Sequence, residues 1–104
     1  MDGMITLLAS STTKDRYGVE KEAYSENEVF CQALSVTRTE FFSAGRNGLN
    51  PEHVFKVFAG DYAGERTCIY EGVRYAVYRT FKPDDDDYIE LYVQREGGTN
   101  GDGD

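Results

Sequence analysis

The stretch TCIYEGVRYAVYRTF at residues 67–81 carries the clearest structural signal in the chain. Two runs rich in β-branched and aromatic residues, 67–70 and 73–81, are separated by the dipeptide Glu71-Gly72. A two-residue connection between antiparallel strands needs positive φ angles, which glycine adopts at no steric cost. The spacing therefore predicts a tight β-hairpin and, with it, a chain organised around short antiparallel strands.

Further short strands are predicted on both sides of this hairpin. Ile89, Leu91 and Val93 alternate with polar residues near the end of the chain, as expected for a strand with one buried face. The polar residues 10–18 indicate a loop. Including this last strand, four runs outside the hairpin have strand character: 4–8, 29–36, 54–59 and 88–95.

The segment between the second and third predicted strands has no strand pattern. Thr39 is in position to cap a short helical turn, and Gly45 or Gly48 can end it before the Asn50-Pro51 break. The fold class that follows is all-β: a small antiparallel β-barrel of about six strands, with one short helix or long loop between strands 2 and 3.

The length of 104 residues allows one domain, and 39% hydrophobic and 13% aromatic residues can supply its core. We expect a single barrel domain over 1–96 and a disordered Gly/Asp tail over 97–104. The start of the chain, MDGM, lacks the pattern of a signal peptide, and no apolar run is long enough to span a membrane. The expected site of synthesis is therefore a cytoplasm.

The formal net charge of −8 is unevenly distributed along the chain. The acidic turn 84–87 carries four negative charges and the tail carries two, in Asp102 and Asp104, which leaves −2 for the rest. Such a chain has no dense cationic surface with which to hold nucleic acid by its phosphates.

The sequence offers few groups for catalysis. Cys31 and Cys68 each lie in an apolar run and are expected to be buried thiols. His53 is the single histidine, and the acidic turn lacks the ligand spacing of a calcium loop, so a solvated turn is favoured over weak cation binding. We therefore predict no catalytic, cofactor or metal site and no enzymatic activity.

Large aromatic residues are concentrated in the last three predicted strands. A small barrel has one narrow interior, so some of these rings should lie outside and contact another subunit or partner. The alternative is a crowded core with tyrosine hydroxyls at its rim. The predicted interface residues are Tyr70, Tyr75, Tyr78, Phe81, Tyr88 and Tyr92.

Several segments together resemble the head-closure family of tailed bacteriophages and prophages of Gram-positive hosts, also called head-tail joining or stopper proteins. The resemblance is carried by SVTRTEFFSAG at 35–45 and GLNPE at 48–52, and continues through the segments at 14–18, 61–65 and 70–80. It runs from about Met4 to Gly98, so that residues 1–3 look like an extension of the family's usual start.

This resemblance implies a structural virion protein without cofactors, located at the head-tail interface and in the host cytoplasm during assembly. It implies a β-barrel that forms a ring of twelve copies below the portal and its adaptor, closes the DNA channel after packaging, and docks the tail. The resemblance also implies that isolated subunits can be monomeric and that their contact with packaged DNA is transient. The segment 38–53 would form the channel gate, with Arg38, Glu40, Phe41, Phe42, Arg46, Asn50 and His53 as its candidate residues.

Two other functions remain open from the sequence. A tail-completion protein of the phage neck would share the small size, acidity and β content. A small barrel could instead bind a ligand or single-stranded nucleic acid by stacking bases on exposed tyrosines. That function would need a basic groove, for which Arg66, Arg74, Arg79 and Arg95 are the candidates.

Overall fold

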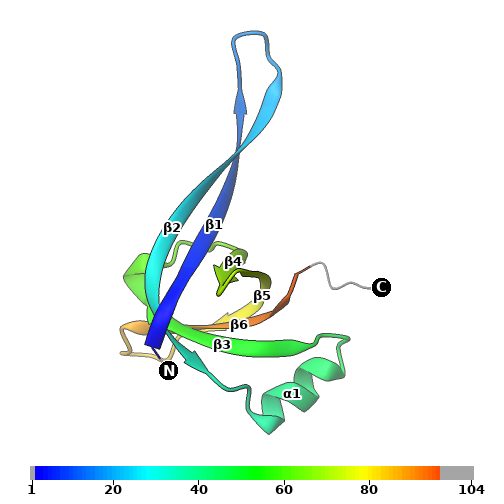
Figure 1. Cartoon of the computed structure of the whole chain (residues 1–104), viewed down its shortest axis with the longest axis vertical. Coiled ribbons are helices and arrows are strands. Elements are labelled where there is room, and N and C mark those ends of the chain that lie inside the picture. Colours follow the sequence, from blue (N-terminus) through cyan, green and yellow to red (C-terminus); the bar gives the residue numbers. More distant parts are fainter. Residues whose placement is uncertain (1, 97–104) are drawn as a thin grey trace.

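Six antiparallel strands close into a barrel, with one short helix outside it (Figure 1). The structure is a computed structural model that describes residues 2–96, without the side chains of residues 10–13, 22 and 24. The strand order around the barrel is β1-β2-β3-β6-β5-β4. The elements are β1 (Asp2–Lys14), β2 (Glu20–Leu34), α1 (Arg38–Gly45), β3 (Pro51–Phe58), the 3-10 helix η1 (Ala59–Asp61), β4 (Thr67–Tyr70), β5 (Val73–Phe81) and β6 (Tyr88–Arg95).

The all-β prediction and the short helix between strands 2 and 3 are confirmed. The predicted tail at 97–104 lies outside the described residues. Side chains that alternate along the strands fill the barrel interior, because successive residues of a strand face opposite sides of the sheet. The buried core comprises Ile5, Leu7, Val29, Cys31, Phe55, Val57, Cys68, Tyr70, Tyr75, Leu91 and Val93.

The hairpin predicted from residues 67–81 is present as β4 and β5. Tyr70 pairs with Val73, so Glu71 and Gly72 alone make the turn. Both have positive φ angles, 52° and 80°, as the primed turn of a two-residue hairpin requires. Gly72 therefore supplies the conformation on which this turn depends.

The prediction of a loop at residues 10–18 is wrong for residues 10–14, which are strand, and right for residues 15–18, which lie in a turn. β1 and β2 pair without a break from Asp2 and Gln32 to Lys14 and Glu20, and form a long two-stranded arm. A run of polar residues does not by itself indicate a loop, because threonine is also favoured in extended strands. Only the tip, between Lys14 and Glu20, is a turn.

The tip of the arm is held by the side chain of Asp15. Its Oδ1 accepts hydrogen bonds from the backbone N–H groups of Tyr17, at 2.8 Å, and Val19, at 3.0 Å. Gly18 has φ +78° and donates its N–H to the Asp15 carbonyl. Aspartate and glycine thus define where β1 ends and β2 begins.

The arm makes the molecule elongated. It extends from one end of the barrel, while α1 lies at the other end of the long axis (Figure 1). The radius of gyration is 15.3 Å, against about 13 Å for a compact domain of this length. The overall extents are 52 × 39 × 24 Å.

Both cysteines are buried and free, as predicted. Burial raises the pKa of the Cys68 thiol to about 12, and burial also raises the pKa of Cys31. Because the thiolate is the reactive form of cysteine, these two side chains are inert parts of the core.

Replacing Phe55 by alanine tests the position of the core. Its ring is 0% exposed, so Phe55→Ala should lower the free energy of unfolding by about 3–5 kcal/mol. Phe30 is 77% exposed, so the matched Phe30→Ala change should alter it by less than about 0.5 kcal/mol. Urea unfolding followed by circular dichroism measures both. Equal losses in the two variants would contradict the described core.

Candidate functional site

The helix α1 and the barrel wall behind it contain the main polar cluster of the described residues. The N-cap is Thr37 and not the predicted Thr39, because the Thr37 hydroxyl accepts the N–H of Glu40 at 3.1 Å. After the last turn, Gly48 has φ +79° and the Leu49 N–H bonds back to the Ala44 carbonyl. Threonine before the helix and glycine after it therefore fix its two ends.

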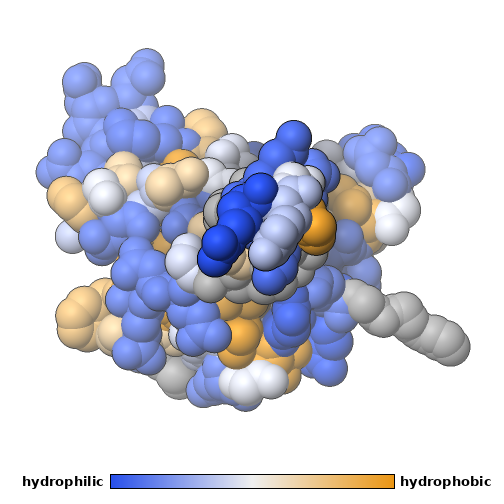
Figure 2. Space-filling view, turned by 90° about the horizontal axis from the view of Figure 1, so that it is seen from above, coloured by the Kyte–Doolittle hydropathy of each residue, from blue (hydrophilic) through white to orange (hydrophobic). Residues whose placement is uncertain are grey.

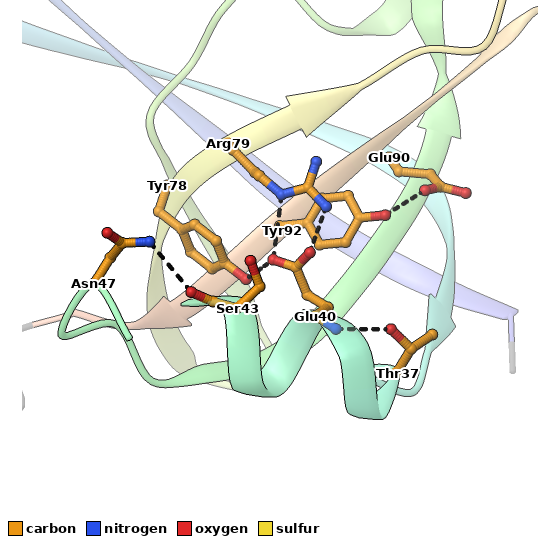
Figure 3. Close-up of polar contacts among 8 residues, drawn as sticks. All are labelled: Thr37, Glu40, Ser43, Asn47, Tyr78, Arg79, Glu90 and Tyr92. Carbon is orange, nitrogen blue, oxygen red and sulfur yellow. Dashed lines mark hydrogen bonds and ion pairs between the residues drawn. The ribbon is translucent and has the colours of Figure 1, made fainter. Parts of the chain in front are cut away.

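Glu40 connects this helix to β5 (Figure 3). Its Oε2 accepts a hydrogen bond from the Tyr78 hydroxyl, at 2.7 Å, and one from Nε of Arg79, at 3.2 Å. The second carboxylate oxygen forms an ion pair with the same guanidinium. A two-pronged arginine contact of this kind fixes both distance and orientation.

A β-bulge allows two consecutive residues of β5 to reach one carboxylate. The pairing of β5 with β6 shifts between Val77, opposite Val93, and Arg79, opposite Tyr92. In a regular strand Tyr78 and Arg79 would point to opposite faces. Val77 faces the core opposite Val93, so Tyr78 already points outward, and the extra residue brings Arg79, opposite the outward Tyr92, to the same face, where both side chains meet Glu40.

Tyr92 on β6 supports the arginine from the other side. The Arg79 guanidinium lies 3.8 Å from the centre of the Tyr92 ring, within the range of a cation–π contact. The Tyr92 hydroxyl in turn donates to Glu90 at 2.7 Å (Figure 3). We call the set Glu40, Tyr78, Arg79 and Tyr92 the helix clamp.

The clamp changes the acidity of its members. Hydrogen bonding from Arg79 holds the pKa of Glu40 below its usual value, so the carboxylate stays ionised. Burial and the neighbouring Glu40 charge raise the pKa of Tyr78, so its hydroxyl remains a donor. The Glu40 side chain is 11% exposed and that of Arg79 is 44% exposed. The clamp is thus a partly buried charge pair that holds α1 in place.

The outer face of α1 is unusually apolar for a short surface helix. Phe41 is 49% exposed and Phe42 62% exposed, whereas the small Ala44 is the buried residue of the helix. α1 packs on β3. Val54 and Lys56 lie on the same side of this strand, and of the two Val54 is buried whereas Lys56 is partly exposed. The helix is therefore attached by one alanine and the clamp, with two phenylalanines free for other contacts.

The predicted gate residues separate into two groups. Arg38, Phe41, Phe42, Arg46 and Asn50 are exposed on or beside α1, and the Asn50 N–H donates to the Gln94 side chain at 2.9 Å. Glu40 is largely buried in the helix clamp. These six residues belong to one segment between β2 and β3.

The placement of His53 in the gate needs correction. β3 begins at Pro51, so His53 belongs to a strand, opposite Val93. Its ring stacks on Phe55 at 5.5 Å and meets Tyr70 and Tyr75 edge-on at 5.6 and 5.3 Å. His53 is therefore part of the aromatic packing of the barrel and lies outside the connection between β2 and β3.

The predicted aromatic interface is also only partly on the surface. Tyr70 and Tyr75 are buried in the core, because both fall on the inward side of their strands, so their assignment to an interface is wrong. Phe81 and Tyr88 are about half exposed. Tyr78 and Tyr92 are half-buried in the helix clamp.

The four arginines of the candidate basic groove do not form a set of unpaired positive charges in the described part of the chain. Three of its four arginines form ion pairs with carboxylates: Arg74 with Glu96, Arg79 with Glu40, and Arg95 with Glu52. Their positive charges are therefore neutralised locally. This arrangement argues against binding of single-stranded nucleic acid through these arginines.

Within residues 2–96, no three His, Cys, Asp or Glu side chains are grouped so that they could hold a metal ion. No helix in this range has the length and apolar character needed to cross a membrane.

No family model matches the chain, and a search of curated proteins finds no match.

Glu40 was predicted from the sequence as a gate residue, but its contacts with Tyr78 and Arg79 were not predicted. The pattern Thr37-x-x-Glu40 is a capping-box sequence, in which the glutamate normally turns back to its own helix. Here the glutamate reaches Tyr78 and Arg79 instead, because a bulge in β5 presents both side chains. Nothing in the sequence of β5 marks that bulge.

A Glu40→Gln variant tests the clamp. Removing the charge should lower the free energy of unfolding at pH 7 by about 1–2 kcal/mol, because Arg79 and Tyr78 lose an ionised acceptor. Since the folded pKa of Glu40 lies below the ordinary value of 4.5, this contribution is fully present above that value and is lost as the pH falls below it. The difference between wild type and variant should therefore shrink between pH 5 and the acid limit, as measured by urea unfolding.

Glu52→Gln provides the matched control. Glu52 also pairs with an arginine, Arg95 at 3.2 Å, but both side chains are more exposed than Glu40. Exposed pairs contribute little, so the change should cost less than about 0.5 kcal/mol. A loss at Glu52 as large as that at Glu40 would contradict the special position of the clamp.

Proposed function

We propose that this chain is a structural protein of the phage neck, which forms a ring, closes the DNA channel below the portal and adaptor after packaging, and docks the tail. The observation that carries this proposal is the resemblance of residues 35–52 to the head-closure family. This stretch covers α1 and its flanking turns. The closed barrel agrees with the fold that the resemblance implies.

The attachment of α1 is consistent with a movable closure. One small residue, Ala44, and the helix clamp hold the helix to the barrel, while Phe41 and Phe42 face outward. Partly buried charge contacts contribute a few kcal/mol at most, which a new apolar contact of similar size can replace. In the proposed ring, burial of the two phenylalanines against neighbouring subunits would favour the closed channel.

The charge distribution is also consistent with a channel through which DNA moves. Three arginines are paired with carboxylates and the net charge is −8, so acidic groups outnumber basic ones and the chain carries no dense cationic surface that would hold the genome by its phosphates. Weak interaction with DNA is what passage requires. Closure would then come from the shape of the gate and not from attraction to DNA.

Deletion of this reading frame in its phage or prophage tests the proposed function. The expected result is heads that package DNA and then lose it, together with free, complete tails. Electron microscopy and nuclease sensitivity of the packaged DNA measure the two defects. Expression of the wild-type chain from a plasmid should restore infectious particles. Normal infectious particles from the deletion would overturn the proposal.

The double variant Phe41→Ser/Phe42→Ser tests the role of α1 in closure. Both rings are about half exposed or more, so the isolated variant should unfold at nearly the wild-type urea concentration. In the complementation assay it should give filled heads that leak, because the apolar contacts of the closed gate are lost. Full complementation by a correctly folded double variant would exclude these phenylalanines from the gate.

A further inference from the structure

The arm formed by β1 and β2 has two open edges. Among the described strands, β1 pairs with β4 only over Thr6–Leu8, and β2 pairs with β3 only over Gln32–Leu34. Beyond these points the arm strands pair only with each other. A two-stranded ribbon is marginally stable in water, and its outer edges present unpaired backbone donors and acceptors.

The β1 side of the arm lacks most of the features that keep an edge strand from pairing. It contains no proline, and β1 runs from Ala9 to Thr13 without a charged residue. About six residues of β1, 9–14, extend past its pairing with β4, which corresponds to about 20 Å of strand. The open edge of β2 is longer still. Both edges are therefore long enough to accept another strand.

Charge selects which strand can pair with which edge. β2 carries four glutamates and one lysine between residues 20 and 28, so two β2 edges placed side by side would bring carboxylates together. The exposed length of β1 is neutral up to Lys14. An acidic β2 edge is thus compatible with a β1 edge and disfavours a second β2.

We infer that successive copies of this chain associate head to tail, with β1 of one arm added to the open edge of β2 in the next copy. Because β1 and β2 are antiparallel within each arm, copies that all point the same way bring β2 beside an antiparallel β1. Each copy then uses both of its edges, and a head-to-tail contact of this kind gives a ring when the rotation between successive copies closes. The place of this ring in a virion rests on the proposed function.

Two hollows lie at the base of the arm, one beside each open edge. Where β2 leaves β3, a hollow of about 570 Å³ is lined by Asp2 and Asp61 together with Lys56 and exposed aromatic rings. Where β1 leaves β4, a hollow of about 340 Å³ is lined by Arg66 and Arg74 together with Glu65. The β2 side therefore has one excess negative charge, whereas on the β1 side Arg74 is paired with Glu96 and Arg66 lies beside Glu65, so that the charges there balance.

The surface seen along the arm agrees with a polar, backbone-mediated contact. Viewed from the tip of the arm, the near end of the molecule is largely hydrophilic, and apolar side chains lie mainly around the barrel behind it (Figure 2). Strand addition suits such a surface, because the affinity comes from main-chain hydrogen bonds. An apolar docking face is not required along the arm.

Disulfide capture between two single-cysteine variants tests this contact. Ser11 and Ala23 are paired within the arm, so they lie at the same level on β1 and β2. In a mixture of Ser11→Cys and Ala23→Cys proteins, oxidation at high concentration should give the mixed disulfide in several-fold excess over either homodimer. Mass spectrometry of the linked peptides identifies the products. Capture accumulates even weak complexes, so a monomeric average state does not prevent detection.

The control mixture pairs Ala23→Cys with Asp84→Cys, a residue exposed in the turn between β5 and β6. This mixture should give no product above that of the wild type, whose two cysteines are buried. Predominant Ala23→Cys homodimers would show β2–β2 pairing and overturn the head-to-tail arrangement. Absence of any excess mixed product would overturn the arm contact altogether.

A shortened arm separates this inference from the proposed function. Replacing residues 11–23 by Asn-Gly joins the paired Ser10 and Tyr24 through a two-residue turn. The variant should keep the cooperative unfolding of the barrel and fail to complement the phage deletion. Complementation by this variant would overturn the arm contact while leaving the proposed function intact. Failure of the wild-type chain to complement would instead count against the proposed function.

Discussion

The barrel closes through two short seams, and the rest of the structure depends on them. One seam pairs Thr6–Leu8 of β1 with β4, and the other pairs Gln32–Leu34 of β2 with β3. Closing a sheet removes its exposed edges, but β1 and β2 are longer than the seams that hold them. The parts of β1 and β2 beyond the seams therefore extend from the barrel as a two-stranded ribbon. The arm, its open edges and the two hollows at its base all follow from this mismatch in strand length.

The sequence predicted the parts of the fold that rest on local chemistry or on alternation. Glu71-Gly72 identified a hairpin because positive φ strongly limits the residues allowed, and Ile89, Leu91 and Val93 identified a strand with one buried face. The arm was missed because residues 10–14 are all polar, so no apolar alternation marks them as a strand. Tyr70 and Tyr75 were wrongly assigned to an interface. Alternate residues of a strand face inward, and the composition of a strand does not show which alternate set that is.

The helix clamp could not be predicted from the sequence, because it also depends on which way the side chains of a strand face. Thr37 and Glu40 form a local pattern, and such a pattern can be recognised. Tyr78 and Arg79 are adjacent in sequence and would be expected on opposite faces of a strand, so only the bulge in β5 makes them partners of one carboxylate. A bulge depends on how two strands accommodate each other, which neither strand encodes alone.

The positions of the arm and α1 at opposite ends of the barrel separate two kinds of contact (Figure 1). The arm offers backbone edges, which give extended pairing with little dependence on side-chain identity, and so suit repeated contacts between identical copies. α1 offers Phe41 and Phe42 on a weakly attached helix, which suits a contact that forms in one state and is released in another. Since no described hydrogen bond or ion pair joins α1 to the arm, a change at the helix need not disturb pairing along the arm. In the proposed ring, a subunit built in this way would keep its neighbours while its helical segment changes position, which is the combination that closure requires.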